Sequence, residues 1–431
     1  MKKLIYHFIA RSMGYIQKEQ QDKPEAKLEK ILKHAHENSP YYRALFLHHN
    51  IVDDGRVILN RFHDIPFLNR DILRHRASEL TSQNSGGRQT YWNTSGGSTG
   101  EPVKFLQDKD YLRASRAITY QQKTWTGYAL GDAMIKLWGD DKEILLESKT
   151  IKSRVINVVK NLTLLNSFSM SAERMREYLR IINKIRPRLI VAYAQAMYEL
   201  CKFAEEHQLQ ITGVQAVMTS AGTLHPFMRE TIERVCGVRV FNRYGTREVG
   251  SIACECEHHA GMHVACDCVH LEIVDQNGTP CPPGVEGEIV ITSLINYSMP
   301  LIRYKIGDFG ILAEKPCLCG REGVLLQGVT GRVTDAFRTK AGKVVPAEYF
   351  IHFVGVVLNK GVIRKFQIIQ KDYDLVNVKL VPAGGYGEND RDEIVRIIKI
   401  AMGENCTVHV NLVDEIPPLK SGKYRYTISE I

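Results

Sequence analysis

The stretch Tyr91-Trp92-Asn93-Thr94-Ser95-Gly96-Gly97-Ser98-Thr99-Gly100-Glu101-Pro102-Val103-Lys104 gives the first indication of the fold. It places three glycines and four hydroxyl residues between an aromatic pair and a proline. A loop of this composition can direct several backbone N–H groups into one concavity, as a polyphosphate requires. The spacing differs from the G-x-x-x-x-G-K-[ST] loop, because Lys104 comes too late and no Ser or Thr follows it. We predict a phosphate-binding loop, with a polar linker or an ordinary turn as the alternative.

The segment from Thr94 to Pro102 resembles the phosphate loop of the adenylate-forming enzymes, the acyl- and aryl-CoA ligase superfamily, and in particular its phenylacetate-CoA ligase-like branch. Further motifs follow in that family's order along nearly the whole chain. The resemblance implies that ATP and an organic acid, aryl or acyl, form an acyl-adenylate with release of pyrophosphate. Transfer of the acyl group to CoA would then give a thioester. ATP, Mg²⁺ and CoA are the implied cofactors.

The resemblance assigns the β- and γ-phosphates of ATP to residues of the glycine-rich loop. These residues are Thr94, Ser95, Gly96, Gly97, Ser98, Thr99 and Gly100. A second motif, Tyr244-Gly245-Thr246-Arg247-Glu248, resembles the family's Tyr-Gly-x-Thr-Glu. It implies that Tyr244 packs on adenine, Thr246 contacts the α-phosphate and Glu248 orders Mg²⁺. Because Arg247 separates the threonine from the glutamate, which hydroxyl meets the phosphate stays open.

Three more segments complete the implied nucleotide site. Ser220, Ala221 and Gly222 would form the backbone wall of the adenine pocket. Asp308, in Tyr304-Lys305-Ile306-Gly307-Asp308, would accept hydrogen bonds from both ribose hydroxyls, since a carboxylate is an acceptor only. Without the other motifs, Asp308 reads as a turn residue. The resemblance also places a ribose contact at Arg332 and an interdomain hinge at Asp335.

Near the C-terminus, Pro418-Leu419-Lys420-Ser421-Gly422-Lys423-Tyr424-Arg425 resembles the family's closing motif. Lys423 then corresponds to the catalytic lysine, whose ammonium group can reach the carboxylate and the α-phosphate. Lys420 is a rival, and a lysine in such a turn is by itself usually a solvated surface residue. We predict a large N-terminal domain over residues 1–332 and a small, mobile α+β lid domain over 333–431 that carries Lys423.

A cysteine and histidine cluster lies within residues 254–319 and holds seven of the ten cysteines. Cys256, His263, Cys317 and Cys319 provide three thiolates and one imidazole, the closed set that structural zinc prefers. We therefore predict a structural Zn²⁺ site. Cys254 is the rival ligand, and unliganded thiols are the alternative to zinc. Clustering of this kind in an intracellular chain indicates metal more often than disulfides.

Helical and strand patterns alternate through the middle of the chain. Strands are predicted at 132–137, 189–193, 216–223 and 238–241, and helices at 110–125, 171–185, 196–207 and 226–235. This alternation indicates βαβ units and a parallel sheet, with ligands beyond the carboxyl ends of the strands. From Cys281 onward the pattern favours β structure. The predicted class is α/β, with a β-rich subdomain and an α+β C-terminal domain.

The overall composition of the chain excludes fewer classes of function than the motifs do. With 431 residues and 44% hydrophobic content, the chain can bury a large core. The net charge of +9 comes from scattered basic residues, which suits ATP and CoA and does not favour nucleic acid. No apolar run reaches the roughly 20 residues that span a bilayer. We expect a cytoplasmic protein without a membrane partner, and a homodimer is one option for its assembly.

Two other functions stay open from the sequence. A related enzyme would pass the acyl group to an amine or a carrier protein, as in capsule or natural-product assembly. A nucleotide-binding zinc protein without catalysis would be expected to lack the lysine or the phosphate loop, and both motifs are present. The acid is undetermined, although its pocket should involve Trp138, Tyr193 and the segments around Ala221 and Arg243.

Overall fold

The structure is a computed structural model that describes residues 23–94, 103–138, 161–167, 170–332, 337–340, 344–345, 349–350, 354, 362–417 and 425–431. These residues form two compact units. The first comprises residues up to 306 and 311–328, and the second comprises 307–310 and the residues from 329 onward. Each unit is described separately below.

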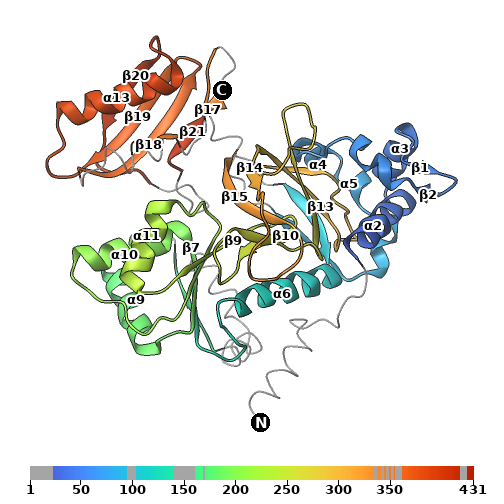
Figure 1. The fold of residues 1–431 in the computed structure, drawn as a ribbon, viewed down its shortest axis with the longest axis horizontal. Helices are drawn as coiled ribbons and strands as arrows, with labels where there is room; N and C mark the ends of the chain where they lie inside the picture. The colour runs from blue at the N-terminus through green and yellow to red at the C-terminus, as the bar shows by residue number, and fades with distance from the viewer. Residues whose placement is uncertain are drawn as a thin grey trace. The chain divides into compact units, whose positions relative to one another are not determined.

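An eleven-stranded sheet dominates the fold, in the order β12-β13-β14-β15-β11-β10-β9-β8-β7-β5-β6 (Figure 1). Its strands are β5 (Met134–Leu137), β6 (Leu162–Leu165), β7 (Leu189–Tyr193), β8 (Val217–Ser220), β9 (Val240–Thr246), β10 (Gly250–Glu255), β11 (Met262–Val264), β12 (Val269–Val274), β13 (Glu286–Ser293), β14 (Tyr304–Leu312) and β15 (Leu325–Arg332). The division between the two units cuts β14 and β15.

The half of the sheet from β6 to β9 is parallel throughout. Its strands are short apolar runs, as expected where helices cover a sheet. On one face, α9 (Ala172–Ile185), α10 (Ala194–Glu206) and α11 (Pro226–Cys236) pack over a core that includes Ile190, Val217 and Val240 (Figure 1). These helices connect successive strands, so the chain forms the βαβ units that the sequence predicted.

Local signals fix the ends of these helices. The Ser171 hydroxyl caps α9 by accepting from the Arg174 N–H. Pro226 opens α11, where its missing N–H costs nothing, and Gly237 ends that helix at a φ of 66°. Helix α6 (Lys109–Thr124) begins at Asp108, whose carboxylate accepts from the Tyr111 N–H at 2.7 Å, and it packs against β10. Sequence therefore determines where each helix starts and turns back.

The other half of the sheet is antiparallel at the pairs β9–β10, β10–β11, β11–β15 and β12–β13. The sequence placed the start of β-rich structure at Cys281, and this is wrong: β10 already begins at Gly250. Strands β10 and β11 are short and almost wholly buried, so they lack the alternation of apolar and polar residues that identifies a half-buried strand.

The remaining elements of the first unit lie N-terminal to β5. They are α2 (Pro24–Asn38), α3 (Pro40–His48), β1 (Val52–Asp53), β2 (Arg56–Val57), η1 (Leu59–Asp64), α4 (Arg70–His75), α5 (Ala77–Leu80), η2 (Gln83–Gly87), β3 (Thr90–Thr94) and β4 (Lys104–Asp108). Pro40 ends one helix, as expected, and also starts the next, which the sequence did not predict. Strands β3 and β4 form an antiparallel hairpin in a separate two-stranded sheet.

The second unit has its own sheet, in the order β20-β19-β18-β21. Its elements are β16 (Phe337–Arg338), β17 (Val344–Val345), β18 (Ile363–Asp372), β19 (Leu375–Pro382), α13 (Glu388–Met402), β20 (Thr407–Leu412) and β21 (Thr427–Ser429). Phe366, Val378 and Ile398 lie in a shared core, so α13 packs on the sheet. The predicted α/β class with an α+β C-terminal unit is confirmed.

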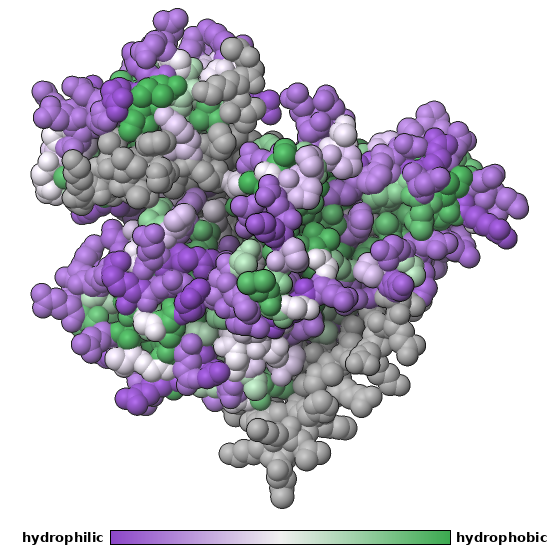
Figure 2. All heavy atoms as spheres, viewed as in Figure 1, coloured by the Kyte–Doolittle hydropathy of each residue, from purple (hydrophilic) through white to green (hydrophobic). Residues whose placement is uncertain are grey.

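Polar side chains cover most of the described surface visible in Figure 2, and the apolar areas on that face are small. Among the described residues, no helix is both long and apolar enough to cross a membrane.

Candidate active site

The first part of the site lies at the carboxyl end of β8. Ser220 is buried at this end, and Ala221 follows with a φ of 60°. The left-handed conformation is unfavourable for a residue with a side chain, so the turn is strained at Ala221. Ligands of open α/β sheets bind beyond the carboxyl ends of the parallel strands, where this turn lies.

The neighbouring strand, β9, carries the Tyr244-Gly245-Thr246 motif. A Cβ on residue 245 would lie 2.5 Å from the Gly250 carbonyl oxygen, so only glycine fits there. The Thr246 Oγ1 accepts from the Val249 N–H at 3.3 Å, which stabilises the turn into β10. The backbone at this motif is therefore closely specified by its antiparallel neighbour.

A hydrogen-bond chain ties the β3–β4 hairpin to this turn. Gln107 Nε2 donates to the carbonyl oxygens of Arg247 and Glu248 at 3.0 and 3.3 Å, and Asn93 Nδ2 donates to Gln107 Oε1 at 3.1 Å. Thr94, one of the predicted phosphate contacts, ends β3 opposite Lys104. The two ends of the hairpin that flank residues 95–102 are thus fixed beside the segment that carries Glu248.

The Glu248 carboxylate is buried, with Arg70 Nη2 at 4.0 Å. A buried carboxylate is stable only when paired or when it binds a cation. Its chemistry therefore fits a Mg²⁺ ligand, as the sequence predicted, and Arg70 is an additional cation at this place. Neither Arg70 nor Gln107 could be predicted from the sequence, because the role of each depends on how distant segments meet.

Trp138 and Tyr193, predicted walls of the acid pocket, do lie together. Their rings stack with centroids 4.1 Å apart, and Lys136 Nζ lies 5.3 Å from the Trp138 centroid. Leu137 pairs with Ala192, and Tyr193 pairs with Ser220 in the next strand. The aromatic pair therefore adjoins the Ser220–Gly222 turn.

Several predicted residues cannot be placed in this geometry. Ser95, Gly96, Gly97, Ser98, Thr99, Gly100 and Lys423 lie outside the described residues, as does the hinge candidate Asp335. Asp308 is buried in β14 and groups with the second unit. Arg332 ends β15. The roles of these residues remain predictions.

The four residues predicted as zinc ligands lie together. The donor atoms of Cys256, His263, Cys317 and Cys319 are all within 4.8 Å of one another. Cys256 Sγ lies 3.6 Å from Cys317 Sγ, and Cys319 Sγ lies 3.2 Å from His263 Nε2. Three thiols and an imidazole at these separations fit a tetrahedral Zn²⁺ site.

Two sulfurs of this Cys/His cluster accept backbone hydrogen bonds, and burial raises the pKa of the Cys256 thiol to about 12. The backbone N–H groups of His258 and Arg321 donate to the sulfurs of Cys256 and Cys319, each at 3.4 Å. Burial lowers the pKa of His263, which keeps the imidazole neutral and able to ligate. Leu318, between two of the cysteines, is 91% exposed because both neighbours point inward.

The rival ligand Cys254 lies elsewhere. Its side chain packs in an apolar cluster with Phe241 and Met218, and its Sγ donates to the Glu255 carbonyl oxygen. Burial raises the pKa of the Cys254 thiol. Cys254 is therefore not part of the four-residue group.

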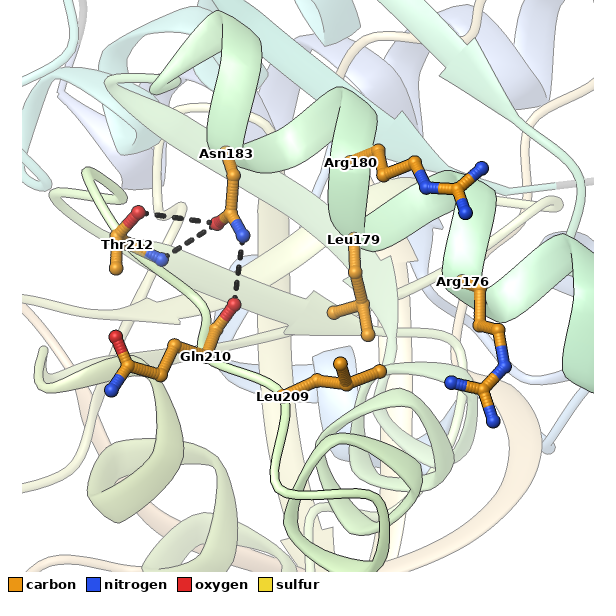
Figure 3. Close-up of a pocket in the computed structure, with 7 residues that line it drawn as sticks. All are labelled: Arg176, Leu179, Arg180, Asn183, Leu209, Gln210 and Thr212. Atoms are coloured by element: carbon orange, nitrogen blue, oxygen red, sulfur yellow. Dashed lines mark hydrogen bonds between the residues drawn. The ribbon is translucent and has the colours of Figure 1, made fainter.

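A surface groove of about 300 Å³ lies between α9 and the segment that precedes β8 (Figure 3). Its lining residues are Arg176, Leu179, Arg180, Asn183, Leu209, Gln210 and Thr212. Asn183 bridges the groove by donating to the Gln210 carbonyl oxygen and accepting from the Thr212 N–H (Figure 3). Thr212 precedes the amino end of β8, so this part of the groove is away from the strand ends that carry the motifs.

Comparison with known families agrees with this arrangement. Residues 162–297 match the AMP-binding enzyme family, and residues 337–430 match the CapK C-terminal domain. The first match spans β6 to β13, including the β8 turn and the β9 motif. The chain is therefore similar to AMP-binding enzymes in its middle part and to the CapK C-terminal domain in its last part.

Individual relatives cover most of the chain. Protein CapK of Staphylococcus aureus is 22% identical over 94% of this chain and 88% of its own length. Phenylacetate-coenzyme A ligase of Thermus thermophilus is 23% identical over 93% of this chain and 94% of its own length. A crystal structure of 2-hydroxyisobutyryl-CoA ligase in the postadenylation state, with 2-HIB-AMP, has a TM-score of 0.74 at 17% identity and covers 94% of this chain and 88% of its own. The resemblance to the phenylacetate-CoA ligase-like branch of the adenylate-forming superfamily is confirmed.

Proposed function

We propose that this protein activates an organic carboxylic acid with ATP, forming an acyl-adenylate and releasing pyrophosphate, and that CoA then accepts the acyl group. The observation that carries the proposal is the pair of hydrogen bonds from the Gln107 side chain to the carbonyl oxygens of Arg247 and Glu248. They hold the hairpin that flanks the glycine-rich segment against the backbone of Arg247 and Glu248, beside the carboxyl ends of the parallel strands. A phosphate loop and a metal-binding carboxylate must be adjacent in an enzyme that transfers an adenylyl group.

Each residue has a proposed task. Thr94 and the loop residues after it would bind the β- and γ-phosphates, Tyr244 would pack on adenine, and the Ser220–Gly222 turn would line its pocket. Glu248 would hold Mg²⁺, which would neutralise phosphate charge. Asp308 and Arg332 would contact the ribose. Lys423 would neutralise charge as the carboxylate oxygen attacks the α-phosphorus.

Residues 1–332 would form the nucleotide- and acid-binding domain, and residues 333–431 a lid that carries Lys423. Cys256, His263, Cys317 and Cys319 would hold a structural Zn²⁺. This ion would link the end of β10, β11 and the turn at Cys317, beside a small apolar cluster that includes Leu325.

The match to the CapK C-terminal domain favours a second candidate acceptor. In that version the adenylate forms in the same way, but an amine or a carrier protein receives the acyl group. Purified enzyme supplied with the acid and ATP, then with CoA, hydroxylamine or a phosphopantetheinylated carrier protein, would separate the two by mass spectrometry of the product.

Pyrophosphate release from a panel of acids tests the adenylation step. We expect acid-dependent release that falls about 1000-fold in Lys423→Ala and Glu248→Gln, since each removes charge stabilisation at the transferring phosphate. Lys420→Ala is the matched control and should retain activity. Failure of every acid to support release would favour a nucleotide-binding protein without catalysis.

A further inference from the structure

One basic side chain on β9 has no partner that explains its burial. The Nε of Arg243 is buried and makes no hydrogen bond among the described residues. Burial lowers the pKa of this guanidinium, and the described group that acts on its charge is the Cys254 thiol. The side chain as a whole is only partly buried, so Nε is the atom left without either a partner or water, and an unmet buried donor is costly.

The sheet determines the direction of this side chain. Phe241, two residues earlier on β9, packs in the apolar cluster with Met218 and Val191. Because alternate residues of a strand share a face, Arg243, Ser220 and Tyr193 project from the same face as that cluster. Cys254, which pairs with Arg243, belongs to the cluster as well.

These residues form a row across the carboxyl ends of the parallel strands. Tyr193 pairs with Ser220, and Thr219 pairs with Asn242, which sets Arg243 beside Ser220. Trp138 continues the row through its stacking on Tyr193. The row therefore has an aromatic end at Trp138 and a cationic end at Arg243.

We infer that Arg243 determines substrate specificity by binding a second anionic group, a second carboxylate, on the acid that is activated. This inference rests on the proposed function. Arg243 precedes Thr246 by three residues, about 10 Å along an extended strand. Thr246 projects from the opposite face, so an acid that reacts beyond the carboxyl end of β9 would reach Arg243 by lying along the Ser220–Tyr193 row. Its planar fork matches a carboxylate bidentately, and Trp138 and Tyr193 would contact the apolar part between the two groups.

The first experiment uses the free protein. Arg243→Met should leave the thermal midpoint unchanged or raise it, because it removes an unpaired buried charge. Arg303→Met is the matched control and should lower the midpoint, because Arg303 is paired with Glu272. A midpoint lowered as much by Arg243→Met as by Arg303→Met would show that the folded protein already pairs Arg243, which would overturn the inference.

The second experiment compares matched acids, namely benzoate with isophthalate and terephthalate, and pentanoate with glutarate. Wild type should release pyrophosphate faster with the diacids, and Arg243→Met should lower the ratio of kcat/KM for diacids to kcat/KM for monoacids by about 100-fold. Arg243→Lys should retain part of the preference. Equal losses for both kinds of acid, or a wild type that prefers monoacids, would refute the assignment.

A third measurement keeps the inference separate from catalysis. The thermal shift produced by isophthalate or glutarate, relative to benzoate or pentanoate, should be present in wild type and absent in Arg243→Met. If the diacids gave the larger thermal shift but no acid supported pyrophosphate release, the proposed adenylation would be refuted and Arg243 would still be supported as an anion site. Equal shifts in both proteins would overturn the inference about Arg243.

Discussion

Two arginines in the first unit, the buried Arg303 and the partly buried Arg243, differ in how they are paired. In the antiparallel half, Arg303 donates to Glu272 at 3.0 and 3.2 Å and to the Ile65 carbonyl oxygen at 2.7 Å, and its guanidinium lies 4.3 Å from the Phe67 ring centroid. On β9, at the edge of the parallel half, Arg243 has no such partners among the described residues. The first arrangement is complete without a ligand, whereas the second lacks an anion.

The comparison extends to the two halves of the sheet. The antiparallel half contains polar groups that satisfy one another, including the Arg303–Glu272 pair and the Cys/His cluster. The parallel half has an apolar interior and places Ala221, at a φ of 60°, and Arg243 at the carboxyl ends of its strands. Left-handed residues also occur in the antiparallel half, at His259 and Arg303, so the contrast between the halves lies in how their arginines are paired.

The largest effect should come from the Cys/His cluster. Cys256→Ser should abolish binding of zinc, measured as about one equivalent in wild type by mass spectrometry of the metal, and lower the free energy of unfolding by about 5 kcal/mol. Leu318→Ser is the control within the same turn and should change neither, because that side chain faces solvent. A wild-type protein without metal, indifferent to chelators, would contradict the zinc site.

Breaking the paired arginine should have the next largest effect. Arg303→Met should lower the free energy of unfolding in urea by about 4 kcal/mol, because Glu272 is left buried and charged without its partner. The double variant with Glu272→Met should recover most of that loss. If the double variant were as unstable as the single one, packing of Arg303 rather than its charge would be responsible.

In the parallel half, His225 predicts a dependence on pH. It is buried at the start of α11, and burial lowers its pKa to about 4. The unfolded chain binds the proton near pH 6.5, so the stability that this histidine contributes is complete above that pH and is lost as the pH falls toward 4. The loss from this group should be about 2 kcal/mol between pH 7.5 and pH 5.

Urea unfolding at the two pH values would measure this contribution. His225→Gln should reduce the difference between them by that amount, since glutamine does not titrate. An unchanged difference would mean that His225 stays neutral or protonated in both states and that carboxylates cause the pH dependence.

The smallest effect should be a gain in stability. Ala221→Gly should stabilise the protein by about 0.5 kcal/mol, because glycine adopts a left-handed conformation without strain and loses only part of that gain to chain entropy. Ala192→Gly, in the interior of β7, is the control and should destabilise by about 1 kcal/mol. Loss of stability in Ala221→Gly would show that the alanine methyl group packs favourably in the turn.

Much of the parallel half could be predicted from the sequence, because apolar runs, capping residues and prolines mark its elements locally. The strand Leu189–Tyr193 was predicted with the bounds that the structure gives. The four residues of the Cys/His cluster could also be predicted from the sequence, because cysteine and histidine are the usual ligands of structural zinc. The antiparallel strands between Gly250 and Val274 were missed because their pairing is non-local and because strands buried on both faces show almost no alternation of apolar and polar residues.

The remaining features depend on register and could not be predicted. No local feature of the sequence distinguishes Gln107 from other glutamines. Its role follows from the β3–β4 hairpin, which brings its side chain to the Arg247 and Glu248 carbonyl oxygens. Arg243 was expected only as part of a pocket wall. Its lack of a partner appears only when every neighbour on its face of the sheet is known.

The most direct test of the account is the mass of the product formed by the enzyme with ATP, Mg²⁺ and its preferred acid in the absence of any acceptor. The account predicts a bound acyl-adenylate, with the combined mass of the acid and AMP less one water, in wild type and not in Lys423→Ala. ATP consumed to ADP, or an acyl-phosphate in place of the adenylate, would contradict it.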